Sequence, residues 1–220
     1  MISSIRREVD KCGITLVKGV QDGNSLIDLA RGLGNPIENP DGNPLKVLRV
    51  MGPESARPRT LSASFGRGRF PLHTDTAFRR LPARFLVMRA SGDIRRPTTV
   101  CSFREIFELA GEGFRKAVRK SVWTLKAHAG PIYCEMEFRG TDGQLGRRYD
   151  RQCMNPANTS AQEVDEYIGS SPFNGLIREI RWAEDLALVI DNWQVLHGRG
   201  PEPVGEEERI LERIYVGESR

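Results

Sequence analysis

The stretch Pro71-Leu-His-Thr-Asp-Thr-Ala-Phe78 places a histidine and an aspartate two residues apart. On an extended strand, residues i and i+2 point to the same face, so His73 and Asp75 would project together while Thr74 turns away. The chain has three histidines, and a second one, His197, lies far downstream. Two histidines and one carboxylate are the minimal set for a facial iron(II) site that leaves half of the coordination sphere open. The sequence therefore favours a redox metalloenzyme as the first hypothesis.

The distal histidine lies in the segment Asp191-Asn-Trp-Gln-Val-Leu-His-Gly-Arg199, which follows the apolar run 186–190. Neutral imidazole and carboxylate ligands suit iron in its +2 state. A His-x-Asp pair is weak evidence by itself, because short motifs of this kind are common without a metal. We expect the remaining histidine, His128, to be a structural or surface residue.

The C-terminal strand offers independent support. In residues 209–216, Arg209 and Arg213 share one face with Leu211 and Tyr215. An arginine that faces a barrel interior needs an anion, because a buried unpaired charge is costly. Guanidinium matches a carboxylate bidentately. A structural ion pair, for example of Arg213 with a barrel glutamate, is an equally good interpretation of these residues alone.

Many short extended segments punctuate the chain. Apolar alternation and turn signals predict strands at residues 13–17, 45–51, 61–65, 70–76, 83–90, 122–127, 132–138, 147–154, 186–190, 193–197 and 209–216. Many strands with few helices predict a mainly β protein with flanking helices, built on a double-stranded β-helix (jelly-roll, cupin-like) core.

Helices are predicted at three places: residues 25–33, residues 103–120 with a break near Gly111-Glu-Gly113, and a short helix that starts at the capping box Ser160-Ala-Gln-Glu163. Thr141-Asp-Gly143 is typical of a hairpin turn. Residues 52–59 form a Pro-rich loop that could act as a lid, and residues 175–182 are ambiguous between helix and strand.

Length and composition indicate one ordinary globular domain spanning residues 1–220. Hydrophobic residues make up 39%, charged residues 28%, and the formal net charge is +4, too small and too interleaved to predict a nucleic-acid partner. No apolar run has membrane-spanning or signal-peptide length, and the four cysteines match no zinc pattern. We expect a cytoplasmic protein with free thiols that binds a small molecule; nothing indicates a homo-oligomer.

Three segments of the chain resemble the taurine dioxygenase/TfdA-like family of iron(II)- and 2-oxoglutarate-dependent oxygenases. They are Phe70-Pro-Leu-His-Thr-Asp-Thr-Ala-Phe78, Leu188-Val-Ile-Asp-Asn-Trp-Gln-Val-Leu-His-Gly-Arg199 and Arg209-Ile-Leu-Glu-Arg-Ile-Tyr215. Their order and separation agree with the family, and weaker similarity runs from Gly13 to Pro36. The resemblance implies a jelly-roll oxygenase domain whose cofactors are Fe(II), 2-oxoglutarate as cosubstrate, and O2.

The resemblance also implies individual roles. His73, Asp75 and His197 would be the iron ligands. Arg209 would bind the distal carboxylate of 2-oxoglutarate, and Thr99 would hydrogen-bond the same group, with Thr98 as the neighbouring candidate. Arg213 matches a position that faces the substrate anion or the cosubstrate in some members.

The implied reaction couples oxidative decarboxylation of 2-oxoglutarate to hydroxylation, desaturation or a related C–H oxidation of a small, amino-acid-like or carboxylate substrate. Halogenating relatives have a small residue where this chain has Asp75, so the resemblance disfavours halogenation. Arg67, Arg69, Arg79 and Arg80 are candidate contacts for an anionic substrate, although we expect most of them to be solvated loop charges. Glu135 and Glu137 could bind an amine or form the polar outer face of a strand. Rival hypotheses are a binding protein on the same fold that has lost turnover, a metal-dependent hydrolase, and a cofactor-free cupin-like enzyme.

Overall fold

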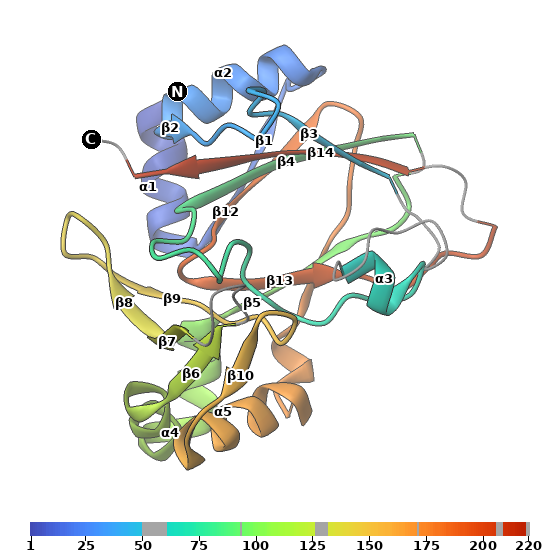
Figure 1. Ribbon diagram of the computed structural model, residues 1–220. Helices are drawn as coiled ribbons and strands as arrows, with labels where there is room; N and C mark the ends of the chain where they lie inside the picture. The colour runs from blue at the N-terminus through green and yellow to red at the C-terminus, as the bar shows by residue number, and fades with distance from the viewer. Residues whose placement is uncertain (50–60, 93, 126–131, 171, 206–208, 219–220) are drawn as a thin grey trace.

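The computed structural model describes residues 1–49, 61–92, 94–125, 132–170, 172–205 and 209–218 (Figure 1). The loop predicted at residues 52–59 and the side chain of His128 lie outside these ranges. Within them, no helix combines the length and the apolar character that a membrane crossing requires.

The larger sheet has antiparallel strands in the order β1 (Ile14–Lys18), β12 (Leu186–Asp191), β4 (Phe85–Gly92), β14 (Arg209–Gly217) and β2 (Asn35–Pro36), with β3 (Lys46–Arg49) also paired to β14. Helices α1 (Ile2–Cys12) and α2 (Gly23–Leu33) cover one face of this sheet (Figure 1). Alternate residues of each strand point toward the helices, so Val87, Val189 and Ile214 share a core with Leu26 of α2.

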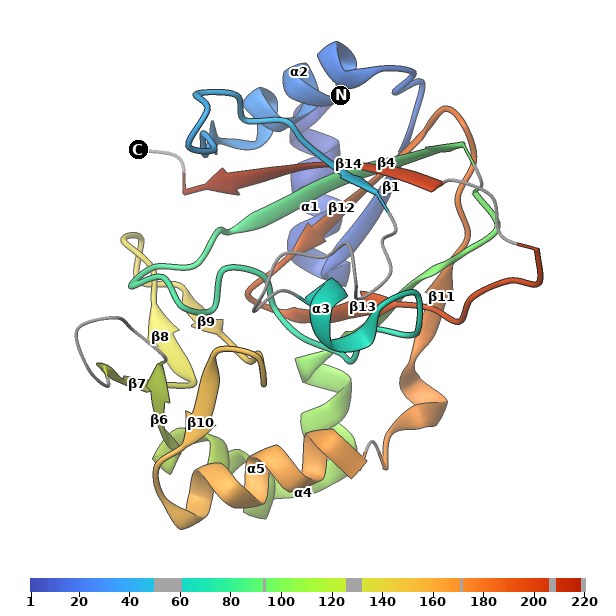
Figure 2. The same ribbon diagram turned by 45° about the vertical axis from the view of Figure 1, so that its right-hand side comes forward.

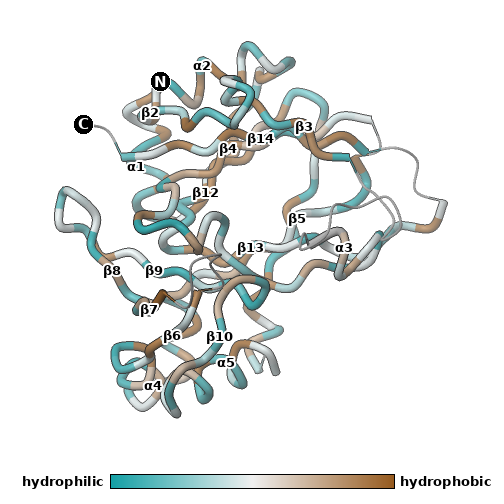
Figure 3. The backbone as a smooth tube through the Cα atoms, in the orientation of Figure 1, coloured by the Kyte–Doolittle hydropathy of each residue, from teal (hydrophilic) through white to brown (hydrophobic). Residues whose placement is uncertain are grey.

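A smaller antiparallel sheet lies opposite, in the order β11 (Arg178–Ile180), β5 (Thr98–Ser102) and β13 (Val195–Arg199). The inner faces of the two sheets meet in one buried cluster that includes Leu86, Leu188, Val100 and Val195. Figure 3 accordingly shows its hydrophobic colouring along β4 and β12. Two opposed antiparallel sheets around a common interior confirm the predicted mainly β, jelly-roll core with flanking helices.

The outer face of the smaller sheet carries a helical layer and further strands. Here α4 (Phe103–Lys120) packs against α5 (Thr159–Ser170), next to a small sheet of β10 (Met154–Pro156), β6 (Val122–Leu125) and β7 (Ile132–Glu135) (Figure 2). A hairpin of β8 (Glu137–Arg139) and β9 (Leu145–Arg147), a short helix α3 (Leu61–Phe65) and a 3-10 turn (Asn174–Leu176) complete the described elements. Trp123, Phe103 and Leu196 belong to the core that joins this layer to β13.

Local chemistry explains where several elements begin and end. The Asp22 carboxylate caps α2 by accepting from the Ser25 N–H at 2.8 Å. In α4 the predicted break is confirmed, because Gly111 has φ 76°, a left-handed conformation that glycine adopts without steric cost. The predicted turn at Thr141-Asp-Gly143 does join two paired strands, β8 and β9.

Three strand predictions were wrong, whereas the helix predicted from Ser160 is confirmed with a slightly earlier start. Residues 61–65 are helical instead of extended, and residues 70–76 contain a single bridge instead of a strand. Residues 148–153 lie outside any strand, between β9 and β10, with a turn at residues 151–153. Helix α5 begins at Thr159, where Asn158 caps it by accepting from the Ala161 N–H at 2.9 Å, so the box at Ser160 is already inside the helix. Helix α1 was not predicted.

Two leucines in helices should contribute very differently to the free energy of unfolding, because only one of them is packed in the core. Leu26 is 0% exposed, whereas Leu109 of α4 is 56% exposed. We expect Leu26→Ala to lower the free energy of unfolding by about 2–5 kcal/mol, because it leaves a cavity in the core. Leu109→Ala should cost less than about 0.5 kcal/mol. Urea denaturation of both variants measures this difference, and equal losses would contradict the packing described above.

Candidate functional site

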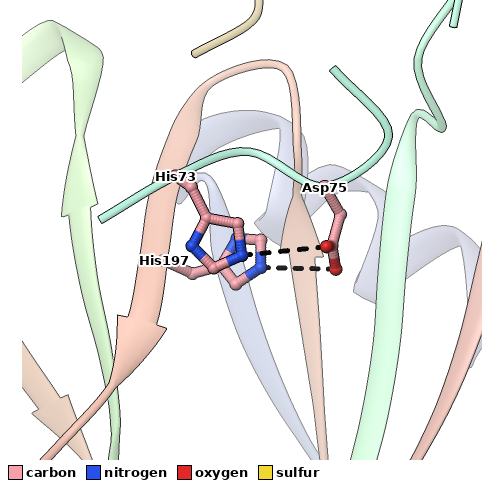
Figure 4. Close-up of side chains that lie close together, drawn as sticks. All are labelled: His73, Asp75 and His197. Atoms are coloured by element: carbon pink, nitrogen blue, oxygen red, sulfur yellow. Dashed lines mark ion pairs between the residues drawn. The ribbon is translucent and has the colours of Figure 1, made fainter. Parts of the chain in front are cut away.

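Two histidines from distant parts of the chain form a cross-strand pair. The His73 N–H donates to the His197 carbonyl at 2.9 Å, and the His197 N–H donates back to the His73 carbonyl at 2.9 Å. Residues that face each other in this way project their side chains from the same side. The two buried rings therefore stand next to each other, with centroids 4.6 Å apart (Figure 4).

The carboxylate of Asp75 completes the group. After the bridge at His73 the chain turns, and Thr76 has φ 58°, which is unusual for a residue with a side chain. Asp75 Oδ1 lies 3.7 Å from His73 Nε2, and Oδ2 lies 3.5 Å from His197 Nε2 (Figure 4). The potential ligand atoms of the three residues all lie within 4.8 Å of one another. The structure thus brings together the three side chains that the sequence singled out.

The side of residues 74–80 that faces away from the three site residues is hydrogen-bonded to Arg148 and Tyr149, which follow β9. Thr74 points away from the site, where its Oγ1 accepts from the Tyr149 N–H at 2.9 Å. The buried Arg148 guanidinium donates to the carbonyls of Ala77 at 3.2 Å, Arg79 at 2.7 Å and Arg80 at 3.0 Å. The loop that follows Asp75 is therefore fixed by a buried arginine that the sequence did not reveal.

Charge within the group is strongly coupled. Burial alone would raise the pKa of Asp75, but the charge of Arg213 and hydrogen bonds from both histidines outweigh it and hold that pKa well below its usual range. Burial lowers the pKa of His73, yet Asp75 more than compensates and the pKa ends above 6.5. Burial and the nearby charge of His73 keep the pKa of His197 below 6.5. The carboxylate thus stays ionised and favours protonation of His73 over protonation of His197.

The donor set fits a divalent metal ion. His73 Nδ1 lies 2.9 Å from the Pro71 carbonyl, which can only accept, so this nitrogen carries the proton in the neutral ring. The lone pair on Nε2 then faces the Asp75 carboxylate, an arrangement that is unfavourable unless a proton or a metal ion lies between them. Two imidazole nitrogens and one carboxylate on one side of a cation are the ligands of a facial iron(II) site.

Strand β14 contributes two arginines from the opposite sheet. Arg213 Nη1 lies 3.2 Å from Asp75 Oδ2, so its partner is the ligand-like carboxylate and not a barrel glutamate. Glu212, on the other face of the strand, pairs with Arg89. Arg209 lies on the same face as Arg213, is 4% exposed, and donates from Nη1 to the Arg96 carbonyl at 2.9 Å. Both arginines thus face the interior, as their spacing predicted.

The register of β5 separates the two candidate threonines. His197 of β13 is opposite Val100, and Arg199 is opposite Thr98, so Thr98 shares the inner face with His197. Thr99 is opposite Gly198 and lies on the outer face, next to Cys101 of the helical layer. The prediction that Thr99 contributes to the site is therefore not supported by the register, and Thr98 has the required orientation. A shift of one residue reverses the face in a strand, which a sequence motif alone does not resolve.

A small pocket, partly open to solvent, includes His73 in its wall but neither Asp75 nor His197. It is lined by Pro71, Leu72, His73, Tyr149, Asp150, Arg151, Ile168 and Gly169. Arg151 pairs with Asp165 through contacts of 2.8 Å and 2.7 Å. The Asp150 carboxylate on the pocket wall accepts from the Gln152 N–H at 2.9 Å through Oδ1 and from the Cys153 thiol at 3.6 Å through Oδ2.

The charged residues suggested from the sequence as substrate contacts lie elsewhere. Arg67, Arg69, Arg80 and Glu135 are exposed, and Arg79 is half-buried. Glu137 forms an ion pair with Arg147 at 2.9 Å. None of these residues lines the cavity beside His73.

Solved structures with a similar fold are numerous. An asparagine oxygenase in complex with Fe(II), 2S,3S-3-hydroxyasparagine and succinate matches with a TM-score of 0.77 and 17% identity over 99% of this chain and 78% of that one. The PvcB protein of Pseudomonas aeruginosa matches with a TM-score of 0.72 and 18% identity over 98% of this chain and 80% of that one. The non-heme iron oxygenase OrfP, in complex with Fe and alpha-ketoglutaric acid, matches with a TM-score of 0.70 and 18% identity over 98% and 79%.

Comparisons of the amino-acid sequence found no relative of this chain. No protein-family model matches the chain, and no curated protein matches it. At identities of 16–18% the structural likeness establishes a common fold. The chain therefore has the architecture of these iron oxygenases.

Proposed function

We propose that this protein is an Fe(II)- and 2-oxoglutarate-dependent oxygenase that oxidises a C–H bond of a small, amino-acid-like substrate. The observation that carries the proposal is the convergence of His73, Asp75 and His197, whose ligand atoms lie within 4.8 Å of one another at the inner face of a jelly roll. The fold supports it, because the solved structures that share the fold include oxygenases containing Fe and alpha-ketoglutaric acid or succinate.

In this proposal His73, Asp75 and His197 hold iron(II). The bound iron would supply the oxidative chemistry that couples decarboxylation of 2-oxoglutarate by O2 to oxidation of the substrate. Arg213 keeps Asp75 ionised, as the low pKa of that carboxyl indicates, and so preserves an anionic ligand at acidic pH. Because Asp75 occupies one ligand position, hydroxylation or desaturation is favoured over halogenation.

The same proposal assigns the cosubstrate to the barrel interior. Arg209 brings a buried cation to the inner face of β14, and a guanidinium can bind one carboxylate of a dicarboxylate through two parallel hydrogen bonds. Thr98 offers a hydroxyl from the opposite sheet, in place of Thr99. These two residues would orient the distal carboxylate while the apolar cluster around Leu188 and Val100 excludes water.

The substrate would occupy the cavity beside His73. Asp150 supplies a carboxylate to its wall and suits an ammonium group, whereas Arg151 is neutralised by Asp165. Among the structures with this fold, one contains 3-hydroxyasparagine and another (3S)-hydroxy-L-Arg. Both are amino acids, which supports an amino-acid-like substrate here. A reducing, cytoplasmic setting agrees with the four free cysteines.

Removing the carboxylate ligand tests the core of the proposal. We expect Asp75→Ala to abolish iron-dependent succinate formation, because two imidazoles alone hold iron(II) weakly. The control is Asp28→Ala, which removes an exposed carboxylate paired with Arg31. Anaerobic addition of Fe(II) and 2-oxoglutarate should give a weak visible charge-transfer band in the wild type and in the control only. A metal-bound wild type without that band would favour a hydrolase, and turnover that persists in Asp75→Ala would refute the ligand assignment.

Truncation of Arg209 tests the cosubstrate site. We expect Arg209→Ala to weaken binding of 2-oxoglutarate by about 2–5 kcal/mol, since a desolvated carboxylate loses its charged partner. The affinity for Fe(II) alone should remain within a factor of about 3. Titration of the iron-loaded protein with 2-oxoglutarate under anaerobic conditions measures both effects. An unchanged cosubstrate affinity would move the role to another residue, with Arg213 first.

The pH dependence of metal binding follows from His73. Its pKa in the metal-free protein is raised above 6.5, and a protonated imidazole cannot coordinate a metal ion. The affinity for Fe(II) should therefore fall by about tenfold per pH unit once the pH drops below that pKa. Calorimetry in two buffers of different ionisation enthalpy should detect a proton released on binding near neutral pH. A constant affinity between about pH 6 and about pH 8 would show that His73 is not a ligand.

A further inference from the structure

The side chain of Asn192 brackets the backbone of Asp75. Asn192 lies between β12 and β13 and is 0% exposed. Its Oδ1 accepts from the Asp75 N–H at 2.8 Å, and its Nδ2 donates to the Asp75 carbonyl at 2.9 Å and to the Ala83 carbonyl at 2.9 Å. One amide thus satisfies both backbone groups of the residue that carries the metal-facing carboxylate.

These three contacts require the chemistry of a primary amide. One backbone N–H needs an acceptor and two carbonyls need donors, so only one orientation of the Asn192 amide satisfies all of them. An ionised aspartate lacks a donor, serine has one donor, and glutamine is longer by a methylene group. Asparagine is therefore the side chain that fits this position in both length and hydrogen-bonding capacity.

The segment that carries Asp75 has little regular structure to fix it. The bridge at His73 and a hydrogen bond from the Phe70 N–H to the Arg199 carbonyl at 3.1 Å join it to β13, and Thr76 is in the left-handed region. A strand ladder, which fixes ordinary sheet residues, is therefore missing at Asp75 itself. The contacts from Asn192 take the place of such a ladder.

Asn192 itself is rigidly placed. Its N–H donates to the Arg84 carbonyl at 3.0 Å, and the adjacent Asp191 carboxylate accepts from the Trp193 N–H at 3.0 Å and pairs with Arg84 at 2.8 Å. Five residues later the same stretch of chain carries His197. The position of Asp75 relative to His197 is thereby determined by one short, well-anchored stretch.

We propose that Asn192 is a positioning residue that aligns the Asp75 carboxylate with the two imidazoles and so sets the metal affinity of the site. The metal itself rests on the proposed function. A purely local role in the turn is disfavoured, because the hydrogen bonds of the Asn192 side chain to described residues reach partners 117 and 109 positions away in the sequence. The bonds that close the turn come from Asp191.

The test compares Asn192→Ala with Asn158→Ala, using Ni(II) alone as the probe. Ni(II) binds nitrogen and oxygen ligands more tightly than Fe(II) and is stable in air. Asn158 is a matched control, because its amide also joins separate segments, through Val122 N–H at 3.1 Å, Ala161 N–H at 2.9 Å and the Lys120 carbonyl at 2.8 Å. We expect Asn192→Ala to weaken Ni(II) binding by about 10–100-fold, and Asn158→Ala by less than about threefold at a similar loss of melting temperature. Equal affinities in the two variants would overturn the proposal.

A double-mutant cycle separates positioning from general destabilisation. If Asn192 acts through Asp75, then Asn192→Ala should weaken Ni(II) binding by less than about threefold in an Asp75→Ala background. The full loss in that background would overturn the proposal, because the effect would not depend on the carboxylate.

Two further outcomes keep this inference distinct from the proposed function. Wild-type protein whose Ni(II) affinity does not depend on Asp75 would overturn both. Wild-type binding that depends on Asp75 but not on Asn192 would overturn only the positioning role. If Asn192→Ala does not fold, Asn192→Ser replaces it, with an expected loss of at least about tenfold in Ni(II) affinity.

Discussion

Two reciprocal backbone hydrogen bonds between His73 and His197 determine the geometry of the whole site. They join a segment with little regular structure to a buried strand, and they bring both imidazoles to one side of the contact with centroids 4.6 Å apart. Because the bonds are made by the main chain, they do not depend on which rotamers the histidines adopt. Three ionisable groups could not remain so close in a buried setting without compensating charge, since an unpaired buried charge is costly. Arg213 supplies such a charge to the carboxylate, with its Nη1 3.2 Å from Asp75 Oδ2.

The two sheets of the barrel supply different parts of this chemistry. The smaller sheet and the segment bridged to it carry the histidines, whereas β14 of the larger sheet carries the arginines. The side chains that we propose as metal ligands and the arginine that we propose for the cosubstrate therefore lie on facing sheets, with the apolar cluster around Leu188 and Val100 between those sheets. A low-polarity interior strengthens both kinds of interaction, because fewer water dipoles screen the charges. Arg209, which is 4% exposed, donates from Nη1 to the Arg96 carbonyl at 2.9 Å, and this hydrogen bond satisfies part of its buried guanidinium.

Much of this could be predicted from the sequence, where its periodicity was strong. Alternation in residues 209–216 correctly placed Arg209 and Arg213 on one face, and Gly111 correctly marked the break in α4. The predicted convergence of His73 and Asp75 was right, but its assumed cause was not, because a bridge and a turn replace the strand. Residues 61–65, Leu-Ser-Ala-Ser-Phe, were misassigned because apolar alternation over only five residues does not distinguish a strand from a short helix. The choice between Thr98 and Thr99 depends on register with β13, and the contacts of Asn192 and Arg148 connect residues far apart in sequence. Neither leaves a local signal.

The stretch from Asp191 to Arg199 organises the site more completely than a list of ligands suggests. Asn192 holds the backbone of Asp75, His197 pairs with His73, and Arg199 donates from Nε to the Gly68 carbonyl at 2.9 Å while its guanidinium lies 3.6 Å above the Phe70 ring. Along one strand and its preceding turn, three successive anchors thus fix residues 68–75 at their two ends and near their middle. A segment that is fixed at three points by side-chain and backbone contacts needs no ladder of its own. Strand propensity could not predict this arrangement, because the stretch of chain that carries His73 and Asp75 is held by these contacts while having almost no regular secondary structure.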